Sequence, residues 1–193
     1  MTFFTGPMFC GKTLELVRHL QVYAAQKIPT VCIRPETDDR SPKIQSRSGL
    51  SYDGLTIPDQ DVATLKNILE NYRVIGLDEV QFFSADIVPI LHQAMKNGHI
   101  ILLSGLDTDF RGQMFPTSAA LFSLPETKIQ RLQAVCSVCH EHAATRTQRL
   151  KNGQPVPSHE PIIAVEHTGA DITYEPRCIN HHIFIETGCP QET

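Results

Sequence analysis

The sequence contains no tryptophan, and aromatic residues make up only 7% of its 193 residues. It has no internal repeat, no low-complexity tract and no apolar run near the roughly 18 residues that a membrane-spanning helix needs. It also lacks a stripe of Lys and Arg, and its formal net charge is −4. Broad neutralisation of phosphates requires a basic surface. We therefore predict no membrane partner and no stable nucleic-acid partner.

Signals for export are also missing. The first residues, MTFFTGPMF, have no basic start, no long apolar stretch and no small-residue cleavage site. The six cysteines are Cys10, Cys32, Cys136, Cys139, Cys178 and Cys189. An even number is typical of disulfides in a secreted protein, but three of these cysteines have metal-ligand spacing in the last third of the chain. The prediction is a reduced compartment, the cytoplasm.

Apolar runs alternate with helical periodicity up to about residue 130. Four segments are predicted strands: one ending at Phe4, 30–34, 73–79 and 99–106. Three segments are predicted helices: 14–24, 61–71 and 85–97. Residues 35–60 have many turn formers and little periodicity, which predicts a long, mobile loop. Strands that alternate with helices indicate βαβ units and a parallel sheet.

The amino-acid composition of the sequence changes near residue 132. Cysteines, histidines and prolines become frequent beyond this point, and no long helical pattern appears. We predict a domain boundary here, with an α/β domain over 1–132 and a small β-rich module over 133–193.

The strongest motif comes almost at the N-terminus. Gly6, Gly11, Lys12 and Thr13 satisfy the pattern G-x-x-x-x-G-K-[ST] in full. The glycines let successive N–H groups point at phosphate oxygens, and the following helix adds its positive end. Lys12 would reach the β- and γ-phosphates of ATP, and the Thr13 hydroxyl would ligate Mg²⁺. A chance match is disfavoured, because the motif follows a strand and opens an amphipathic helix.

Such a loop requires an acidic partner on a later strand. Asp78 follows the apolar run VIGL, and Glu79 comes directly after it. Two adjacent carboxylates can divide the work, one on Mg²⁺ and the other accepting a proton from an attacking hydroxyl. The alternative is a solvated acidic turn.

The C-terminal module contains two half-sites for a metal. Cys136-x-x-Cys139 and Cys178-x-x-His181 have the spacing of a structural Zn²⁺ site. The long separation between them suggests two knuckles that bracket a β-hairpin and a loop. His182 competes with His181 as the fourth ligand. Four protein ligands leave no open position, so we predict a structural metal and no catalytic role for it.

Taken together, these motifs resemble those of type II thymidine kinases. The resemblance runs nearly end to end through GPMFCGKT, TDDR, DEVQFF, GLDTDFRGQMF, CSVC, ATRTQRL, GAD and YEPRCINHH, in this order. It implies the fold class α/β, a P-loop (RecA-like) parallel sheet flanked by helices, with a small C-terminal zinc-binding β module. It also implies a kinase that transfers the γ-phosphoryl group of ATP to the 5′-hydroxyl of thymidine, and a homotetramer.

The resemblance further assigns residues to each ligand. For ATP these are Gly6, Pro7, Met8, Phe9, Cys10, Gly11, Lys12, Thr13, Asp39, Arg40, Asp78, Glu79, Val80 and Gln81. For thymidine they are Phe110, Ala164, Val165, Glu166, His167, Thr168 and Tyr174. Within these sets, Thr13 and Asp78 hold Mg²⁺, Glu79 is the proton acceptor, Phe110 stacks on the thymine base and Tyr174 contacts the sugar end.

The chain departs from the family pattern at three places. Cys10 replaces the usual serine of the phosphate loop, His181 replaces a cysteine, and AVEHTGAD is less glycine-rich than the common form. Arg111 is either a further cation for the reaction or a surface arginine. Two rival functions share the phosphate loop: an ATPase with a zinc ribbon that acts on nucleic acid, and a nucleoside kinase of another fold.

Overall fold

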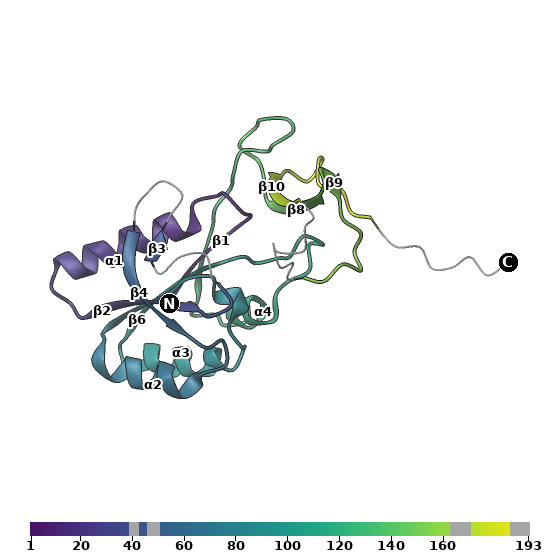
Figure 1. Ribbon diagram of the computed structural model, residues 1–193. Helices are drawn as coiled ribbons and strands as arrows, with labels where there is room; N and C mark the ends of the chain where they lie inside the picture. Colours follow the sequence, from purple (N-terminus) through teal and green to yellow (C-terminus); the bar gives the residue numbers. More distant parts are fainter. Residues whose placement is uncertain (39–42, 46–50, 163–170, 186–193) are drawn as a thin grey trace. The chain divides into compact units, whose positions relative to one another are not determined.

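The computed structural model describes residues 1–38, 43–45, 51–162 and 171–185 (Figure 1). The chain divides into two compact units. The first unit comprises Met1–Gly6, Gly11–Asp107 and Met114–Leu132. The second comprises Pro7–Cys10, Thr108–Gln113 and Gln133–Thr193. None of the described helices is both long enough and apolar enough to cross a membrane.

The first unit is built on one sheet with the strand order β3-β4-β2-β5-β6-β1-β7. Its strands are β1 Thr2–Thr5, β2 Thr30–Pro35, β3 Lys43–Gln45, β4 Ser51–Ile57, β5 Val74–Leu77, β6 Ile100–Gly105 and β7 Lys128–Arg131. Six of them pair in parallel, and only β3 runs antiparallel to its neighbour β4. This confirms the predicted α/β class with a parallel sheet.

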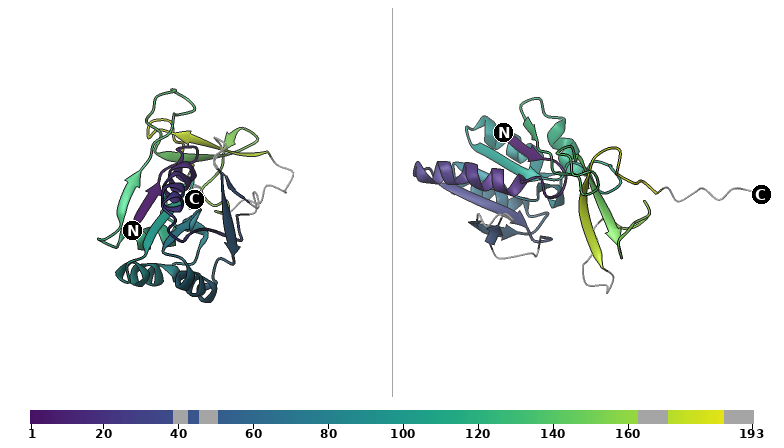
Figure 2. Two further views of the ribbon diagram at one scale, coloured as in Figure 1. Left: turned by 90° about the vertical axis from the view of Figure 1, so that its left-hand side faces the viewer. Right: turned by 90° about the horizontal axis from the view of Figure 1, so that it is seen from above.

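Helices cover both faces of this sheet (Figures 1 and 2). The helices are α1 Lys12–Ala25, α2 Val62–Asn71, α3 Ile87–Lys96 and α4 Pro116–Phe122, with the short 3-10 helix η1 at Val80–Phe82. On one face, α1 packs its apolar stripe against Phe4 and its neighbours. On the other face, α2, α3 and α4 pack in a larger cluster that contains Phe3. Adjacent residues of β1 thus serve opposite faces, as strand geometry requires.

Local chemistry sets the helix ends. The carboxylate of Asp61 accepts the N–H of Thr64 at 2.9 Å, which caps the start of α2. Beyond Asn97, Gly98 has φ +90°, the left-handed conformation with which many helices end.

The predicted loop over 35–60 is wrong in part. β4 lies within it and pairs with β2, with Ile33 opposite Leu55 and Pro35 opposite Ile57. Only Ile57 of this strand is buried, so β4 is held mainly by main-chain hydrogen bonds and leaves no clear apolar pattern in the sequence. The same reason hides β7, an edge strand with the polar sequence KIQR.

The second unit contains a three-stranded antiparallel sheet with the order β10-β8-β9. Its strands are β8 Arg146–Lys151, β9 Gln154–Pro155 and β10 Ile172–Arg177. The segment before β8 folds back on itself through a bridge between Ala134 and Ala144. These strands confirm the prediction that the part of the chain beyond residue 132 is rich in β-structure.

Candidate active site and metal centre

The phosphate-loop motif spans the turn from β1 to α1. Gly6 has φ +141° and Gly11 has φ +89°, and Phe9 also adopts a positive φ, of 68°. Gly11 occupies the N-cap of α1 and provides no capping side chain for the N–H groups of the first turn. N–H groups at such a helix start bind anions well. The backbone thus has the form that the motif predicts.

The hydroxyl of Thr13 at the start of α1 meets the carboxylate of Asp78, just beyond β5. Thr13 Oγ1 lies 3.1 and 3.2 Å from the two carboxylate oxygens, and the hydroxyl of Ser104 also donates to Oδ1. Burial, and then the charge of Glu79, raise the pKa of Asp78 to about 6. A hydroxyl and a carboxylate are the hard oxygen ligands that suit Mg²⁺. The two residues therefore fit the predicted magnesium site.

Glu79 differs from its neighbour in both exposure and backbone. It is half-buried, whereas Asp78 is buried, and its φ of 48° lies in the left-handed region. Strained backbone of this kind in a non-glycine residue is concentrated at functional sites. Gln81 Nε2 donates to Glu79 Oε2 at 2.6 Å, which fixes the direction of the carboxylate.

Gln81 is held in turn by the residue that follows β6. Its Oε1 accepts the N–H of Leu106 at 3.0 Å. A Cβ at Gly105 would lie 2.4 Å from this oxygen, so only glycine leaves room for the side chain. The orientation of Glu79 thus depends on a chain of contacts that ends at the backbone directly after β6.

In the second unit, Phe110 and Arg111 lie in a turn organised by Asp109. Asp109 accepts the Arg111 N–H and pairs with its guanidinium at 2.6 Å. The pairing of Arg111 with a carboxylate gives it a structural partner within this turn. Phe110 is 5% exposed, and His182 Nε2 donates to its carbonyl oxygen at 2.9 Å.

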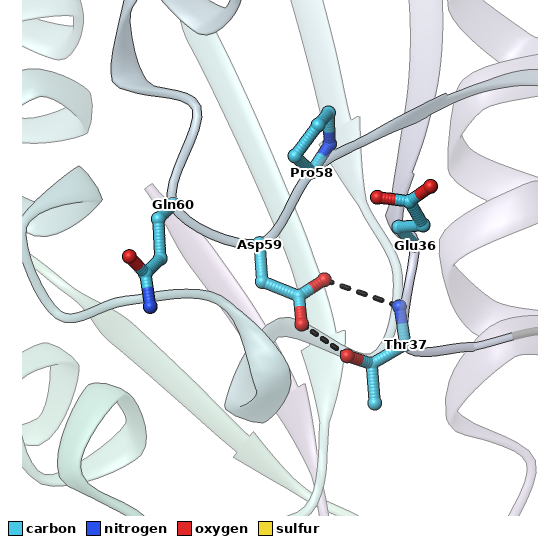
Figure 3. Close-up of a pocket in the computed structure, with 5 residues that line it drawn as sticks. All are labelled: Glu36, Thr37, Pro58, Asp59 and Gln60. Carbon is cyan, nitrogen blue, oxygen red and sulfur yellow. Dashed lines mark hydrogen bonds between the residues drawn. The ribbon is translucent and has the colours of Figure 1, made fainter.

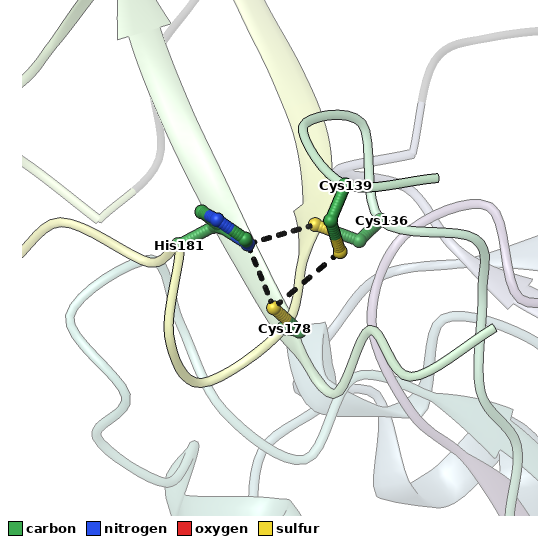
Figure 4. A group of neighbouring side chains, drawn as sticks. All are labelled: Cys136, Cys139, Cys178 and His181. Carbon is green, nitrogen blue, oxygen red and sulfur yellow. Dashed lines mark hydrogen bonds between the residues drawn. The ribbon is translucent and has the colours of Figure 1, made fainter. Parts of the chain in front are cut away.

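The four predicted metal ligands come together in the second unit (Figure 4). Their ligand atoms all lie within 4.8 Å of one another. Cys139 Sγ is 4.0 Å from Cys178 Sγ, and His181 Nδ1 is 3.9 Å from Cys136 Sγ. A tetrahedral Zn²⁺ with Zn–S bonds of about 2.3 Å separates its sulfurs by about 3.8 Å. The cluster therefore fits zinc.

The thiol of Cys136 also favours metal binding. Burial raises the pKa of Cys136, but the N–H groups of Cys139, Cys178 and Val138 outweigh this and lower it to about 6. The thiolate is the form that binds metals. Cys10 of the phosphate loop packs against the small apolar cluster that includes Cys136 and Cys178. His182, the alternative fourth ligand, instead contacts Phe110.

A shallow hollow of about 440 Å³ lies beside the carboxyl ends of β2 and β4 (Figure 3). Glu36, Thr37, Pro58, Asp59 and Gln60 line it, and Asp59 accepts the N–H of Thr37 at 3.2 Å. Its charged residues are both acidic, so it does not suit phosphate.

Seven of the predicted ligand-binding residues lie outside the described residues. They are Asp39, Arg40, Ala164, Val165, Glu166, His167 and Thr168. Tyr174 lies in β10, directly opposite Arg149 of β8.

Two residues at these sites carry no distinctive sequence signal. Ser104 ends an apolar strand, where the alternation of the sheet places it on Asp78. Arg149 stands in the polar run TRTQRL, which is typical of a solvated strand, yet it is 1% exposed.

A phosphate loop between a buried strand and a helix, with a hydroxyl–carboxylate pair behind it, defines a phosphate-loop nucleotide-binding protein. Comparison with known proteins narrows this class. A family model described as thymidine kinase matches residues 1–182. A thymidine kinase from Pyrobaculum aerophilum is 39% identical over 183 residues, which cover 93% of this chain and 96% of that protein. The chain belongs to the thymidine kinase family.

Proposed function

We propose that this protein transfers the γ-phosphoryl group of ATP to the 5′-hydroxyl of thymidine. The observation that carries the proposal is the contact of Thr13 with Asp78, with Glu79 adjacent, in a chain of this family. The ATPase that acts on nucleic acid is not favoured, because the family match includes the cysteine-rich module as well as the phosphate loop.

In the proposed reaction, the phosphate loop, the start of α1 and Asp78 neutralise and position the phosphates. Lys12 and the loop N–H groups bind ATP, and Thr13 with Asp78 would hold Mg²⁺, which supplies charge neutralisation when bound. Phosphoryl transfer depends mainly on positioning and on such neutralisation. The remaining ATP ligands are proposed to be Gly6–Gly11, Asp39, Arg40 and Glu79–Gln81.

Glu79 accepts the proton of the 5′-hydroxyl in this proposal. Its half-buried side chain is accessible, and the hydrogen bond from Gln81 orients it. Asp78 is unsuited to this task because it is buried and already accepts two hydroxyl donors. The two adjacent carboxylates thus take different roles, and their different burial supports the division.

The second unit recognises the nucleoside in the proposal. Thymine stacks on the face of Phe110 opposite Arg149, residues 164–168 contact the pyrimidine edge, and Tyr174 contacts the sugar. Cys136, Cys139, Cys178 and His181 would hold zinc, which would stabilise the knuckle from which His182 reaches Phe110. We assign ATP binding to residues 1–132 and nucleoside covering to residues 133–193.

Several finer properties follow from the family resemblance and belong to the same proposal. Deoxyuridine is a second substrate, since it differs from thymidine only by a methyl group. The protein works as a homotetramer in the cytoplasm and forms no stable complex with nucleic acid, in keeping with a net charge of −4.

Product formation from Mg·ATP tests the proposal with thymidine, deoxyuridine, deoxycytidine, deoxyadenosine and deoxyguanosine as acceptors. The expected result is thymidine monophosphate as the main product, with deoxyuridine also phosphorylated. ATP hydrolysis with no phosphorylated nucleoside would reject the kinase. Stimulation of that hydrolysis by DNA would instead support the nucleic-acid ATPase.

A further inference from the structure

Arg149 is an unusual residue for the middle of β8. It is the largest of the side chains less than 2% exposed in the described part of the chain. Its guanidinium carbon lies 4.0 Å from the centroid of the Phe110 ring, so the cation covers one face of the ring. A buried cation is strongly unfavourable unless its surroundings compensate for lost water.

The other partners of Arg149 are main-chain carbonyls. Nη1 donates to the oxygen of Pro161 at 2.5 Å and to that of Ile162 at 3.2 Å. Within the described residues, its partners are thus uncharged: one aromatic ring and two carbonyl oxygens. All of them belong to the second unit. One planar guanidinium therefore joins the turn that carries Phe110 to the segment that ends at Ile162.

The place of Arg149 in the sheet relates these contacts to the proposed nucleoside site. Arg149 is directly opposite Tyr174 in the β8–β10 pair, and residues in such a pair project on the same face. Thr147, two residues away on that face, accepts the Met8 N–H at 3.0 Å. Ile162 directly precedes the segment 163–170, which contains the residues proposed to contact thymine. Arg149 thus contacts one proposed thymidine ligand, Phe110, and lies across the strand pair from another, Tyr174.

We propose that Arg149 is a positioning residue for thymidine. It holds the Phe110 ring from behind and ties it to the carbonyls of Pro161 and Ile162, so its loss lowers the affinity for thymidine and not for ATP. This inference rests on the proposed function. Lysine is a poor substitute, because an ammonium group lacks the flat face and fork of a guanidinium.

Steady-state kinetics of the zinc-loaded protein test this with Arg149→Met and Arg149→Lys. A desolvated cation–π contact and two hydrogen bonds predict a rise in the KM for thymidine of about 10- to 100-fold in Arg149→Met. Arg149→Lys should fall between this variant and the wild type. The KM for ATP should stay within about twofold of wild type, because ATP binding rests on other groups.

Arg131→Met is the matched control. Arg131 also lies over an aromatic ring, at 4.8 Å from the centroid of Phe122, but it is exposed and belongs to the first unit. We expect no change in either KM. Guanidinium ion at non-denaturing concentration should lower the KM for thymidine of Arg149→Ala, since it can occupy the vacated space. A structural defect would reduce zinc content and active fraction and would not be rescued in this way.

Hydrogen exchange separates this inference from the proposed function. The amides of residues 156–162 should exchange faster in Arg149→Met than in wild type or Arg131→Met, whatever the substrate is. A wild-type protein that leaves thymidine unphosphorylated would reject the proposed function, and the exchange result would still decide whether Arg149 holds this segment. Unchanged exchange, or an unchanged KM for thymidine in an active kinase, would overturn the inference.

Discussion

The interiors of the two units are stabilised by different interactions. The first unit has two apolar clusters, one on each face of its sheet, with large side chains such as Phe3, Phe4 and Leu91 fully buried. The apolar cluster of the second unit consists of Ala134, Cys136, Ala144 and Cys178. Burial of large apolar side chains is the main stabilising term in folding. The second unit must therefore rely more on polar contacts, to which zinc at the Cys/His cluster would add.

The functional groups follow the same division. In the first unit, backbone geometry positions them: strand ends deliver Asp78 and Ser104, and Gly6 and Gly11, both with positive φ, stand at the two ends of the phosphate loop. In the second unit, side chains hold main-chain groups. Gln148 makes two hydrogen bonds with the backbone of Ile183, at 2.7 and 3.2 Å, and His182 holds the Phe110 carbonyl. Sites of the second kind depend more strongly on single side chains.

The largest expected effect is selective loss of the second unit. Cys178→Ala removes a proposed zinc ligand, and structural zinc contributes directly to folding. We expect loss of bound zinc, rapid hydrogen exchange over residues 146–151 and 172–177, and no measurable thymidine binding. The strands of the first unit should remain protected. Cys189→Ala is the control, and full activity in metal-free Cys178→Ala would contradict the difference between the units.

Glu79→Gln should impair chemistry without loss of either unit. The substitution keeps the shape of the side chain but removes the proposed proton acceptor. We expect kcat to fall by about 10²–10⁴-fold, the usual scale of general base catalysis, with little change in the KM for ATP. The exposed Glu70 of α2 gives the control Glu70→Gln. Near-normal turnover in Glu79→Gln would remove Glu79 from this role.

A substitution that creates a cavity in the core of the first unit is the complementary experiment. Leu91 is fully buried in the larger apolar cluster, so Leu91→Ala should lower the free energy of unfolding by about 2–5 kcal/mol. Denaturant unfolding measures this change. Added zinc should leave the loss uncorrected, and zinc content should equal that of wild type. Recovery of stability with zinc would show that the units do not rely on separate forces.

The pH dependence should show the smallest effect. Burial and Glu79 raise the pKa of Asp78 to about 6, so the kcat/KM for Mg·ATP should fall as the pH drops through about 6, where Asp78 gains a proton. In Glu79→Gln, the fall of the residual activity on the acid side should move to a lower pH, because one of the causes of the raised pKa of Asp78 is removed. If this fall does not move, it reports the titration of another group.

The raised pKa of Asp78 should affect stability in the direction opposite to its effect on activity. The ordinary pKa of Asp78 is 3.8. Between about pH 4 and 6, the folded protein keeps a proton that the unfolded chain has lost, so this group's contribution to stability falls as the pH rises through that window. Denaturant unfolding without Mg²⁺ at pH 4.5 and at pH 7 would detect this change in the free energy of unfolding.

Sequence patterns predicted the central strands, which are buried and apolar, and missed β4 and β7, which have few buried apolar residues. The runs VIGL and IILL identified β5 and β6 because both faces of a central parallel strand are buried. β4 and β7 leave little such trace, since pairing with a neighbouring strand suffices to hold them. Periodicity reports burial and says little about main-chain hydrogen bonds.

The candidate site divides in a similar way. The phosphate loop and the cysteine half-sites have fixed spacing, because a loop or knuckle brings their groups together locally. Arg149 and Phe110 are distant in sequence and meet only through tertiary structure. No spacing rule connects them, and a polar strand sequence suggests exposure for an arginine that is in fact buried.

Hydrogen exchange with each ligand tests the central division most directly. A non-hydrolysable ATP analogue with Mg²⁺ should slow exchange in residues 11–25 and 74–82 of the first unit. Thymidine added to this complex should then slow exchange in residues 108–113, 146–162 and 171–177 of the second unit. Protection by thymidine confined to the first unit would contradict the account, because nucleoside recognition would then lie outside the zinc-binding unit.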